Sequence, residues 1–148
     1  MTQKNCIFCK IINGEIASYK IFEDNYTIAF LDRFPISLGH TLVIPKVHIG
    51  RIEELNQKET VALFSTVQKI VGPILHSFDS SSSTIGINDG KDAGQVIPHI
   101  HVHIVPRSEG DDGGNIHSIM NKQPTIDEEI LAEVAEKICK NFSKKDVI

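Results

Sequence analysis

Histidines occupy every second position of the segment PHIHVHIV, as His99, His101 and His103. Alternate side chains of an extended chain lie on one face, roughly 6–7 Å apart, so the alternation predicts a strand over 98–105 with the three imidazoles on one side. Near neutral pH, imidazole acts as a nucleophile, a general acid or base, or a metal ligand. The residues alone leave three interpretations: a nucleophilic site, one metal ion bound by all three rings, or a solvated strand face.

Two thiols near the N-terminus have the second informative spacing. Cys6 and Cys9 form a Cys-x2-Cys pair, a spacing that lets two thiolates bind one zinc ion. The chain has 3 cysteines, so they cannot all pair, and in a reducing compartment the close pair fits metal ligands better than a disulfide. Redox chemistry, a disulfide and packed free thiols remain alternatives. Cys139, which lies in a helical apolar pattern, is expected to be a small buried residue.

Strand patterns surround these residues. Aromatic and branched residues predict strands at 19–22 and 26–31, which a polar turn joins into a hairpin. A third strand is predicted at 40–44, where Pro45 ends the hydrogen bonding. A short strand at 84–87 precedes the strand that carries the histidines. Together these segments predict an antiparallel sheet.

Helical spacing of apolar residues occurs in one long segment and two shorter ones. It predicts a helix over 56–78 with a wide buried stripe, a brief helical turn over 10–16 and a C-terminal helix over about 125–142. The segment of about 107–124 is rich in Gly, Asp, Ser and Asn and is expected to be a mobile loop. The elements therefore predict an α+β fold in a single domain over 1–148.

The charge balance limits the classes of partner. Lys and Arg number 15 against 19 Asp and Glu, which gives a formal net charge of -4 and argues against a broad binding surface for nucleic acid. An anionic ligand must therefore be held by local groups. The chain has no run of about 18 apolar residues and no basic, apolar leader, so we expect a cytoplasmic protein that does not bind membranes.

The histidine-rich segment resembles a known family. PHIHVHIVP matches the histidine triad (HIT) motif, in which histidines alternate with hydrophobic residues, and AGQ lies just upstream as in that family. NCIFCKIINGEI, IAFLDRFPISLGHTLVIPKVHI and INDGKDAGQVIPHIHVHIVPR resemble successive family blocks, so the likeness covers about 4–107. The chain resembles the zinc-binding, Cys-x2-Cys branch of small HIT nucleotide hydrolases and transferases. This implies a HIT-like fold of about five antiparallel strands, one long helix and a C-terminal helix, and a homodimer that meets through the long helix and a strand.

The resemblance implies a catalytic role for the middle histidine. In the family this residue, here His101, attacks the α-phosphorus of a nucleotide conjugate and forms a nucleotidyl-histidine that water hydrolyses. His40 and His103 match family residues that contact the phosphate or orient the triad.

The resemblance also implies a nucleotide site. Asp32 matches the carboxylate that binds the ribose hydroxyls, and the implied nucleotide-binding residues are Ile7, Phe8, Ile11, Phe30, Asp32, Asn88, Gly94, Gln95, Val96, His101 and His103. Val96 departs from the family pattern, which usually has a hydroxyl residue after Gly-Gln. The side-chain hydroxyl contact is therefore absent, and phosphoramidate turnover that relies on it becomes less secure.

The same likeness implies a structural zinc ion held by Cys6, Cys9, His48 and His99. A closed four-ligand site has no open position for substrate, so His99 leaves the catalytic row. The implied activity is hydrolysis or nucleotidyl transfer at the α-phosphate, which releases AMP or a similar purine nucleoside monophosphate from a dinucleoside polyphosphate or a nucleoside phosphoramidate. The alternatives are a nucleotide-binding regulatory or scaffold protein with little catalysis, and a zinc-dependent hydrolase that uses the triad as ligands.

Overall fold

The computed structural model describes residues 5–120 and 126–142 and divides into two compact units, Met1–Gly113 and Gly114–Ile148. The sheet and the buried core lie in the first unit. Among the residues described, no helix is both long and apolar enough to cross a membrane.

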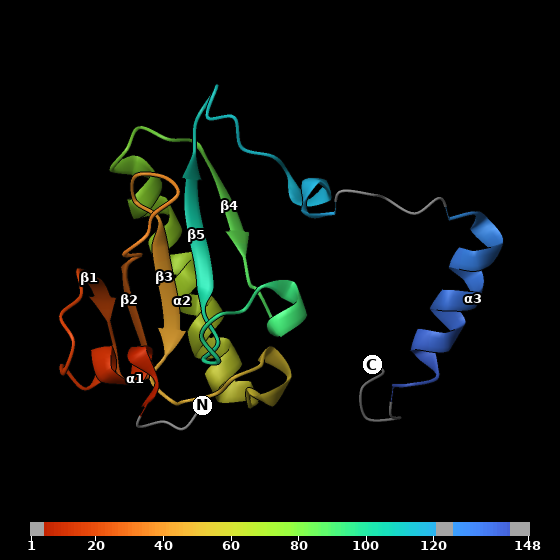
Figure 1. Ribbon diagram of the computed structural model, residues 1–148, viewed down its shortest axis with the longest axis horizontal. Helices are drawn as coiled ribbons and strands as arrows, with labels where there is room; N and C mark the ends of the chain where they lie inside the picture. The colour runs from red at the N-terminus through yellow and green to blue at the C-terminus, as the bar shows by residue number, and fades with distance from the viewer. Residues whose placement is uncertain (1–4, 121–125, 143–148) are drawn as a thin grey trace. The chain divides into compact units, whose positions relative to one another are not determined.

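The first unit is built on a five-stranded sheet in the order β1-β2-β3-β5-β4, in which all neighbours pair antiparallel (Figure 1). The strands are β1 Lys20–Glu23, β2 Thr27–Leu31, β3 Thr41–Pro45, β4 Ser82–Gly86 and β5 Val102–Arg107. The predicted α+β fold with a five-stranded antiparallel sheet and a long helix is confirmed.

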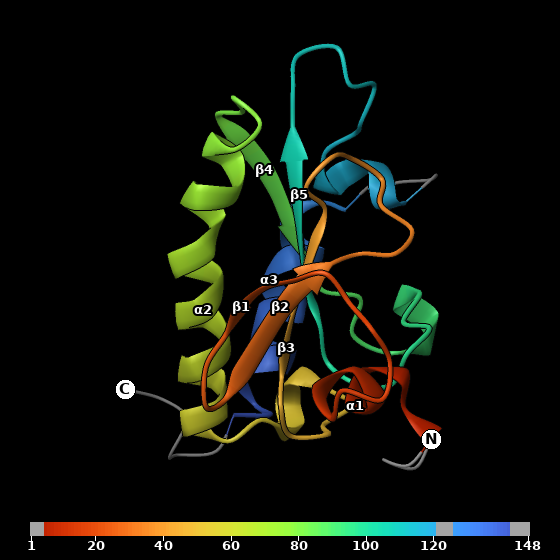
Figure 2. The same ribbon diagram turned by 90° about the vertical axis from the view of Figure 1, so that its left-hand side faces the viewer.

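Two helices lie on opposite faces of this sheet (Figure 2). The long helix α2, Gln57–His76, begins at a capping box: Asn56 Oδ1 accepts from the amide of Glu59, and the Glu59 carboxylate accepts from the amide of Asn56. Pro73 lies inside the last turns of α2, and the helix continues through it. The short helix α1, Ile7–Ile12, covers part of the other face.

Burial on both faces explains the continuous apolar runs in β2 and β3. Ala29 and Val43 pack with the α2 side chains, in the cluster Ala29, Val43, Leu63, Val67, Ile70, Ile74, Ile100, Val102 and Ile104. The alternate residues face α1, in the cluster Cys6, Phe8, Cys9, Ile11, Ile28, Phe30, Leu42 and Ile44. Because successive side chains of a strand point to opposite faces, each of these strands contributes to both layers of the core.

The strand register places one histidine among the residues that face α1. Phe30 pairs with Leu42 across β2 and β3, and Leu42 pairs with His103 across β3 and β5. His103 therefore stands in line with two apolar side chains of the α1 face.

The predicted start of the histidine-rich strand was wrong, because β5 begins at Val102 and not at residue 98. His99 and His101 precede the strand. The amide of Ile100 donates to Ile49 O at 2.7 Å, and the amide of His99 donates to Ile97 O at 2.8 Å, so these amides are not used in the ladder. The alternation of side chains persists nonetheless, with Ile100 in the core.

The first helix also differs from its predicted range of 10–16. It ends at Ile12, and Asn13 is its C-cap. Gly14 has a φ of +76°, a left-handed conformation that terminates the helix instead of belonging to it. The helix starts earlier because Phe8, Cys9 and Ile11 bury one face of it against the sheet.

The second unit contains the 3-10 helix η4, Ile116–Ile119, and the helix α3, Glu128–Cys139. Asp127 caps α3 by accepting from the amide of Ile130 at 3.0 Å. The predicted start of this helix at about residue 125 lies outside the described residues. The described residues of this unit are all exposed, and this includes Cys139, which was expected to be buried.

Candidate active site and metal site

His101 is held by the residue two positions before it. Its Nδ1–H donates to the carbonyl oxygen of His99 at 2.7 Å, which leaves the lone pair on Nε2. Burial lowers the pKa of His101, and the His99 carbonyl and Asp32 act in the opposite direction. The aromatic ring of Phe8 stands edge-on to the imidazole, with the two ring centroids 5.2 Å apart. The result is a neutral, oriented imidazole suited to nucleophilic attack.

His40 and His103 form a second pair of rings. Nε2 of His40 lies 2.9 Å from Nδ1 of His103, and the ring centroids of His103 and His101 are 5.0 Å apart. Burial lowers the pKa of His103 to about 4, and the neighbouring His101 and His40 add to the effect. Burial also lowers the pKa of His40, against the opposing charge of Asp32. Among the described residues, Nε2 of His103 is a buried atom without a hydrogen-bond partner.

Asp32 directly follows β2 and anchors the loop to β3. Its Oδ1 accepts from the amide of Phe34 at 2.9 Å, and its Oδ2 lies 3.6 Å from Nδ1 of His40. Its side chain is 18% exposed, so this carboxylate retains accessible acceptor capacity beside the histidine rings.

A cavity of about 910 Å³ opens beside these rings. Ten of the eleven predicted nucleotide-binding residues line it: Ile7, Phe8, Ile11, Phe30, Asp32, Asn88, Gly94, Val96, His101 and His103. His40 is not among its lining residues, but its ring contacts His103, which does line the cavity. The cavity has an apolar end formed by α1 and β2, and a polar end at the histidines.

Gln95 is placed differently from the prediction. Its Nε2 donates to Gly50 O at 2.8 Å and its Oε1 accepts from the amide of Gly90 at 2.9 Å. It does not line the cavity, and both ends of its amide serve to hold the loop that precedes the triad.

Sequence reasoning missed several residues of the cavity wall. Ile16, Ala17, Ser18, Tyr19, Leu31, Phe34, Pro35, Leu42 and Ile97 also line it. Of these, Leu42 carries a usable signal, because strand pairing places it between Phe30 and His103. Ala17 and Ser18 have none, since they lie between the predicted turn and the first predicted strand, outside any motif.

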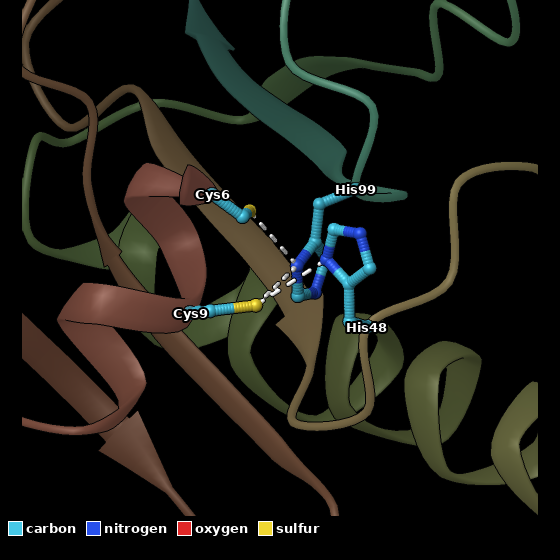
Figure 3. A group of neighbouring side chains, drawn as sticks. All are labelled: Cys6, Cys9, His48 and His99. Atoms are coloured by element: carbon cyan, nitrogen blue, oxygen red, sulfur yellow. Dashed lines mark hydrogen bonds between the residues drawn. The ribbon is translucent and has the colours of Figure 1, made fainter. Parts of the chain in front are cut away.

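The structure brings the four predicted zinc ligands together (Figure 3). Cys6 and Cys9 come from the start of α1, His48 from the segment after β3, and His99 from the segment before β5. One ligand atom from each residue lies within 4.8 Å of the others, and Cys6, Cys9 and His99 are buried.

The distances fit a tetrahedral zinc ion. Cys9 Sγ lies 3.3 Å from His48 Nδ1 and 3.7 Å from His99 Nδ1, and Cys6 Sγ lies 3.6 Å from His99 Nδ1. Ordinary Zn–S and Zn–N bond lengths at tetrahedral angles give a sulfur–nitrogen separation of about 3.6 Å. Nε2 of His99 lies 2.9 Å from Pro45 O, so its N–H is directed to that carbonyl and Nδ1 is the ligand atom.

The electrostatics of these groups are also typical of a buried metal site. Burial raises the pKa of the Cys9 thiol to about 11, with Cys6 acting in the same direction. Burial lowers the pKa of His99 to about 4. The thiol of Cys9 would stay protonated without a cation nearby, whereas a bound zinc ion stabilises thiolates.

This geometry separates the three triad histidines. Nδ1 of His99 faces the thiols, Nδ1 of His101 is committed to the His99 carbonyl, and Nδ1 of His103 faces His40. The three rings therefore do not converge on one point. A single metal held by the whole triad does not fit, and the Asp32, His40 and His103 ligand atoms, although within 4.8 Å, include a nitrogen pair that already shares a hydrogen bond.

The chain is an α+β protein with an antiparallel sheet and a histidine triad beside a cavity, and comparison with known proteins identifies its family. The HIT domain model matches residues 13–110, and the chain belongs to the HIT family.

The chain is 43% identical over 109 residues to adenylylsulfatase HINT3 of Arabidopsis thaliana, covering 74% of this chain and 55% of that protein. It is 42% identical over 96 residues to the asymmetrical bis(5′-nucleosyl)-tetraphosphatase of Schizosaccharomyces pombe, covering 65% of this chain and 53% of that protein. The chain thus spans about half the length of these two relatives.

Solved structures give the same result. A HIT family protein from Bacillus subtilis superposes with a TM-score of 0.84 at 36% identity, over 95% of this chain and 99% of that chain. A Zn-bound histidine triad family protein from Mycobacterium smegmatis superposes with a TM-score of 0.68 at 31% identity, over 95% of this chain and all of that one, 100%.

Proposed function

We propose that the chain is a nucleotide-conjugate hydrolase or nucleotidyl transferase that cleaves at the α-phosphate and releases AMP or a similar purine nucleoside monophosphate. The observation that carries the proposal is the imidazole of His101, whose Nδ1–H is bound to the His99 carbonyl while the ring lines a cavity beside a ribose-type carboxylate. The names of two relatives, an adenylylsulfatase and a dinucleoside tetraphosphatase, support chemistry at a nucleotide phosphate.

The proposed reaction has two displacements. Nε2 of His101 attacks the α-phosphorus, the N–P bond forms, and the bond from phosphorus to the leaving atom breaks with its electron pair going to that atom. The leaving atom accepts a hydrogen bond from the imidazole N–H of His103, whose ring lines the cavity, and takes its proton from solvent. Water then attacks phosphorus and loses one proton to solvent, the N–P bond breaks, and His101 recovers its lone pair.

Binding of the nucleoside is assigned to the two ends of the cavity. Phe8 and Phe30, whose ring centroids are 5.7 Å apart, form part of the apolar slot for the base. Asp32 offers carboxylate acceptors to the ribose hydroxyls. Gly94 has a φ of +86°, which leaves the loop backbone open to close approach by a phosphate.

We also propose that Cys6, Cys9, His48 and His99 hold zinc in a structural role. The support is the fit of the four ligand atoms and the zinc-bound state of one solved relative. The ion would supply a cross-link between α1 and the segments that flank β3 and β5, and its four protein ligands leave no position for substrate.

A second candidate, nucleotide binding with little turnover, has one observation in its favour. Val96 stands where a hydroxyl residue is usual, and its side chain is 86% exposed at the cavity wall. Its backbone N–H remains available for the leaving group, so we favour catalysis.

Homodimer formation is a further part of the proposal. Ile85 of β4 pairs with Ile104 in register, on the face that α2 covers, yet it is 47% exposed, and Phe64 of α2 is 40% exposed. A second copy would cover such residues. Light scattering at micromolar concentration should give the mass of a dimer, and a strict monomer would refute this part.

The catalytic proposal is tested with a panel of diadenosine polyphosphates and adenosine phosphoramidates. His101→Ala should release AMP at least about 10³-fold more slowly than the wild type, because the nucleophile is gone. His76→Ala, at an exposed position of α2, is the matched control and should be unchanged. AMP binding by calorimetry without turnover of any substrate would favour the binding protein, and equal release by wild type and His101→Ala would refute the mechanism.

A further inference from the structure

A chain of three hydrogen-bonding groups leads from a loop amide to the cavity. The backbone N–H of Ile36 donates to Nδ1 of His40 at 3.3 Å. Nε2 of His40 lies 2.9 Å from Nδ1 of His103, and Nε2 of His103 is one of two buried side-chain atoms without a hydrogen-bond partner among the residues described, the other being Oγ of Ser37. The free end of this chain belongs to a ring that lines the cavity.

The first link determines the positions of the protons in the other two. A backbone amide only donates, so Nδ1 of His40 must present its lone pair. A neutral imidazole carries one proton, which in His40 then lies on Nε2 and is donated to Nδ1 of His103. His103 in turn must carry its proton on Nε2, the second nitrogen of a ring that lines the cavity. Burial of both rings keeps them neutral.

No other group near His40 competes for this assignment. Asp32 is the carboxylate closest to Nδ1 of His40, and its Oδ2 is 3.6 Å away, which is too long for a hydrogen bond. Its Oδ1 is already engaged by the amide of Phe34. Ile36 therefore makes the only hydrogen bond to Nδ1 of His40 within the described part of the chain.

We propose that the backbone amide of Ile36 is a positioning group that fixes the tautomers of His40 and His103, so that His103 presents an N–H to the leaving group. Its effect on turnover rests on the proposed function; its effect on the tautomers does not. The side chain of Ile36 takes no part, since it is 77% exposed. Any residue with a backbone N–H satisfies this position, and proline does not.

The loop is built to hold this amide in place. The amide of Asp32 donates to His40 O at 2.9 Å, and the amide of His40 donates to Ser37 O at 3.1 Å, so the two ends of the loop are tied together. Gly39, at a φ of +80°, makes the turn back into β3. The position of the Ile36 amide is thus determined by these backbone hydrogen bonds together with the one that Asp32 Oδ1 accepts from the amide of Phe34.

The test removes the N–H and leaves the side chain unchanged. In one variant the α-hydroxy acid analogue of isoleucine replaces Ile36, which converts the amide to an ester; in a second, Ile36→Pro removes the same donor genetically. Ile36→Ala keeps the donor and is the control. Nitrogen-15 NMR of labelled histidines reports the tautomer of His103 without substrate, and steady-state kinetics on the preferred nucleotide conjugate reports the consequence.

In the wild type and in Ile36→Ala we expect the Nε2–H tautomer of His103. In the ester variant we expect a mixture with the Nδ1–H tautomer and a fall in kcat of about tenfold, the size expected for one lost hydrogen bond, with KM within about twofold. Ile36→Pro should behave like the ester, and if it does not fold, the ester decides. A wild-type Nδ1–H tautomer, an unchanged tautomer in the ester, or a loss confined to KM would each overturn the inference. A wild type that turns over no conjugate would refute the proposed function while the NMR result still judges the tautomers.

Discussion

The main-chain carbonyl oxygen of His99 accepts a hydrogen bond of 2.7 Å from Nδ1 of His101, while the ring of His99 stands among the four residues that could hold a metal ion. One residue therefore contributes its side chain to the candidate metal site and its backbone to the proposed nucleophile. Displacement of the His99 ring would move the carbonyl that orients His101. The candidate metal site and the candidate active site are therefore connected through His99.

Removal of the metal should unfold and inactivate the protein together. We expect about one zinc per chain by elemental analysis. Cys9→Ser, or chelation, should lower Tm by about 10 °C and abolish turnover, because a buried site loses its cross-link. Cys139→Ser removes an exposed thiol and should keep both zinc and activity. Chelation that abolishes activity at an unchanged Tm would instead indicate a catalytic metal.

Asp32→Asn should weaken nucleotide binding through the ribose. The neutral amide still accepts from the amide of Phe34, so the loop is kept, but the charged acceptor for the ribose hydroxyls is lost. We expect Kd for AMP to rise about tenfold and Kd for 2′,3′-dideoxy AMP to change little, as measured by calorimetry. An equal loss for both nucleotides would place Asp32 in a different role.

Gly39→Ala should destabilise the fold by about 1–3 kcal/mol. The φ of Gly39 is +80°, and a Cβ there would collide with the ring of Phe78. Gly86→Ala in β4 is the matched control, because a Cβ there meets nothing within 4 Å and stability should change by less than about 0.5 kcal/mol. Denaturant unfolding measures both, and a neutral Gly39→Ala would show that Phe78 moves freely.

Stability should fall in acid partly through His103. Its pKa is about 4 in the folded protein, below the ordinary value of 6.5, so the unfolded chain binds the proton more readily. This contribution is complete above about pH 6.5 and is lost as the pH falls toward 4. The slope is up to about 1 kcal/mol per pH unit after allowance for screening. His103→Gln should flatten the curve of unfolding free energy in this window, and parallel curves for the two proteins would contradict the prediction.

Residue types and spacing indicated the candidate site residues that belong to short sequence motifs. The alternating histidines indicated His101 and His103, and the Cys-x2-Cys pair indicated a metal site to which His48 and His99 are brought by folding. The sheet and the long helix followed from periodicity, because apolar patterns reflect which faces are buried.

The remaining features depend on contacts between distant segments. The sequence pattern of 98–105 is that of a strand. The carbonyl oxygen of Ile49 nevertheless accepts a hydrogen bond from the amide of Ile100, and β5 begins only at Val102. Gln95 resembles a ligand contact, yet Gly50 and Gly90 occupy both ends of its amide. No side-chain signal exists for a backbone donor such as that of Ile36.

Successive residues of β2 and β3 face opposite sides of the sheet, so adjacent positions have different roles: one packs on α2, and the next lies on the side of the cavity. Ala29 and Val43 meet the long helix, while Phe30 and Leu42, one residue away on the same strands, belong to the layer of the cavity and the metal ligands. Substitutions on the helix side can therefore accumulate, or be engineered for heat resistance, with the reactive side left intact. Of two neighbouring residues on one strand, one is thus constrained by the packing volume against α2 and the other by the shape of the cavity wall.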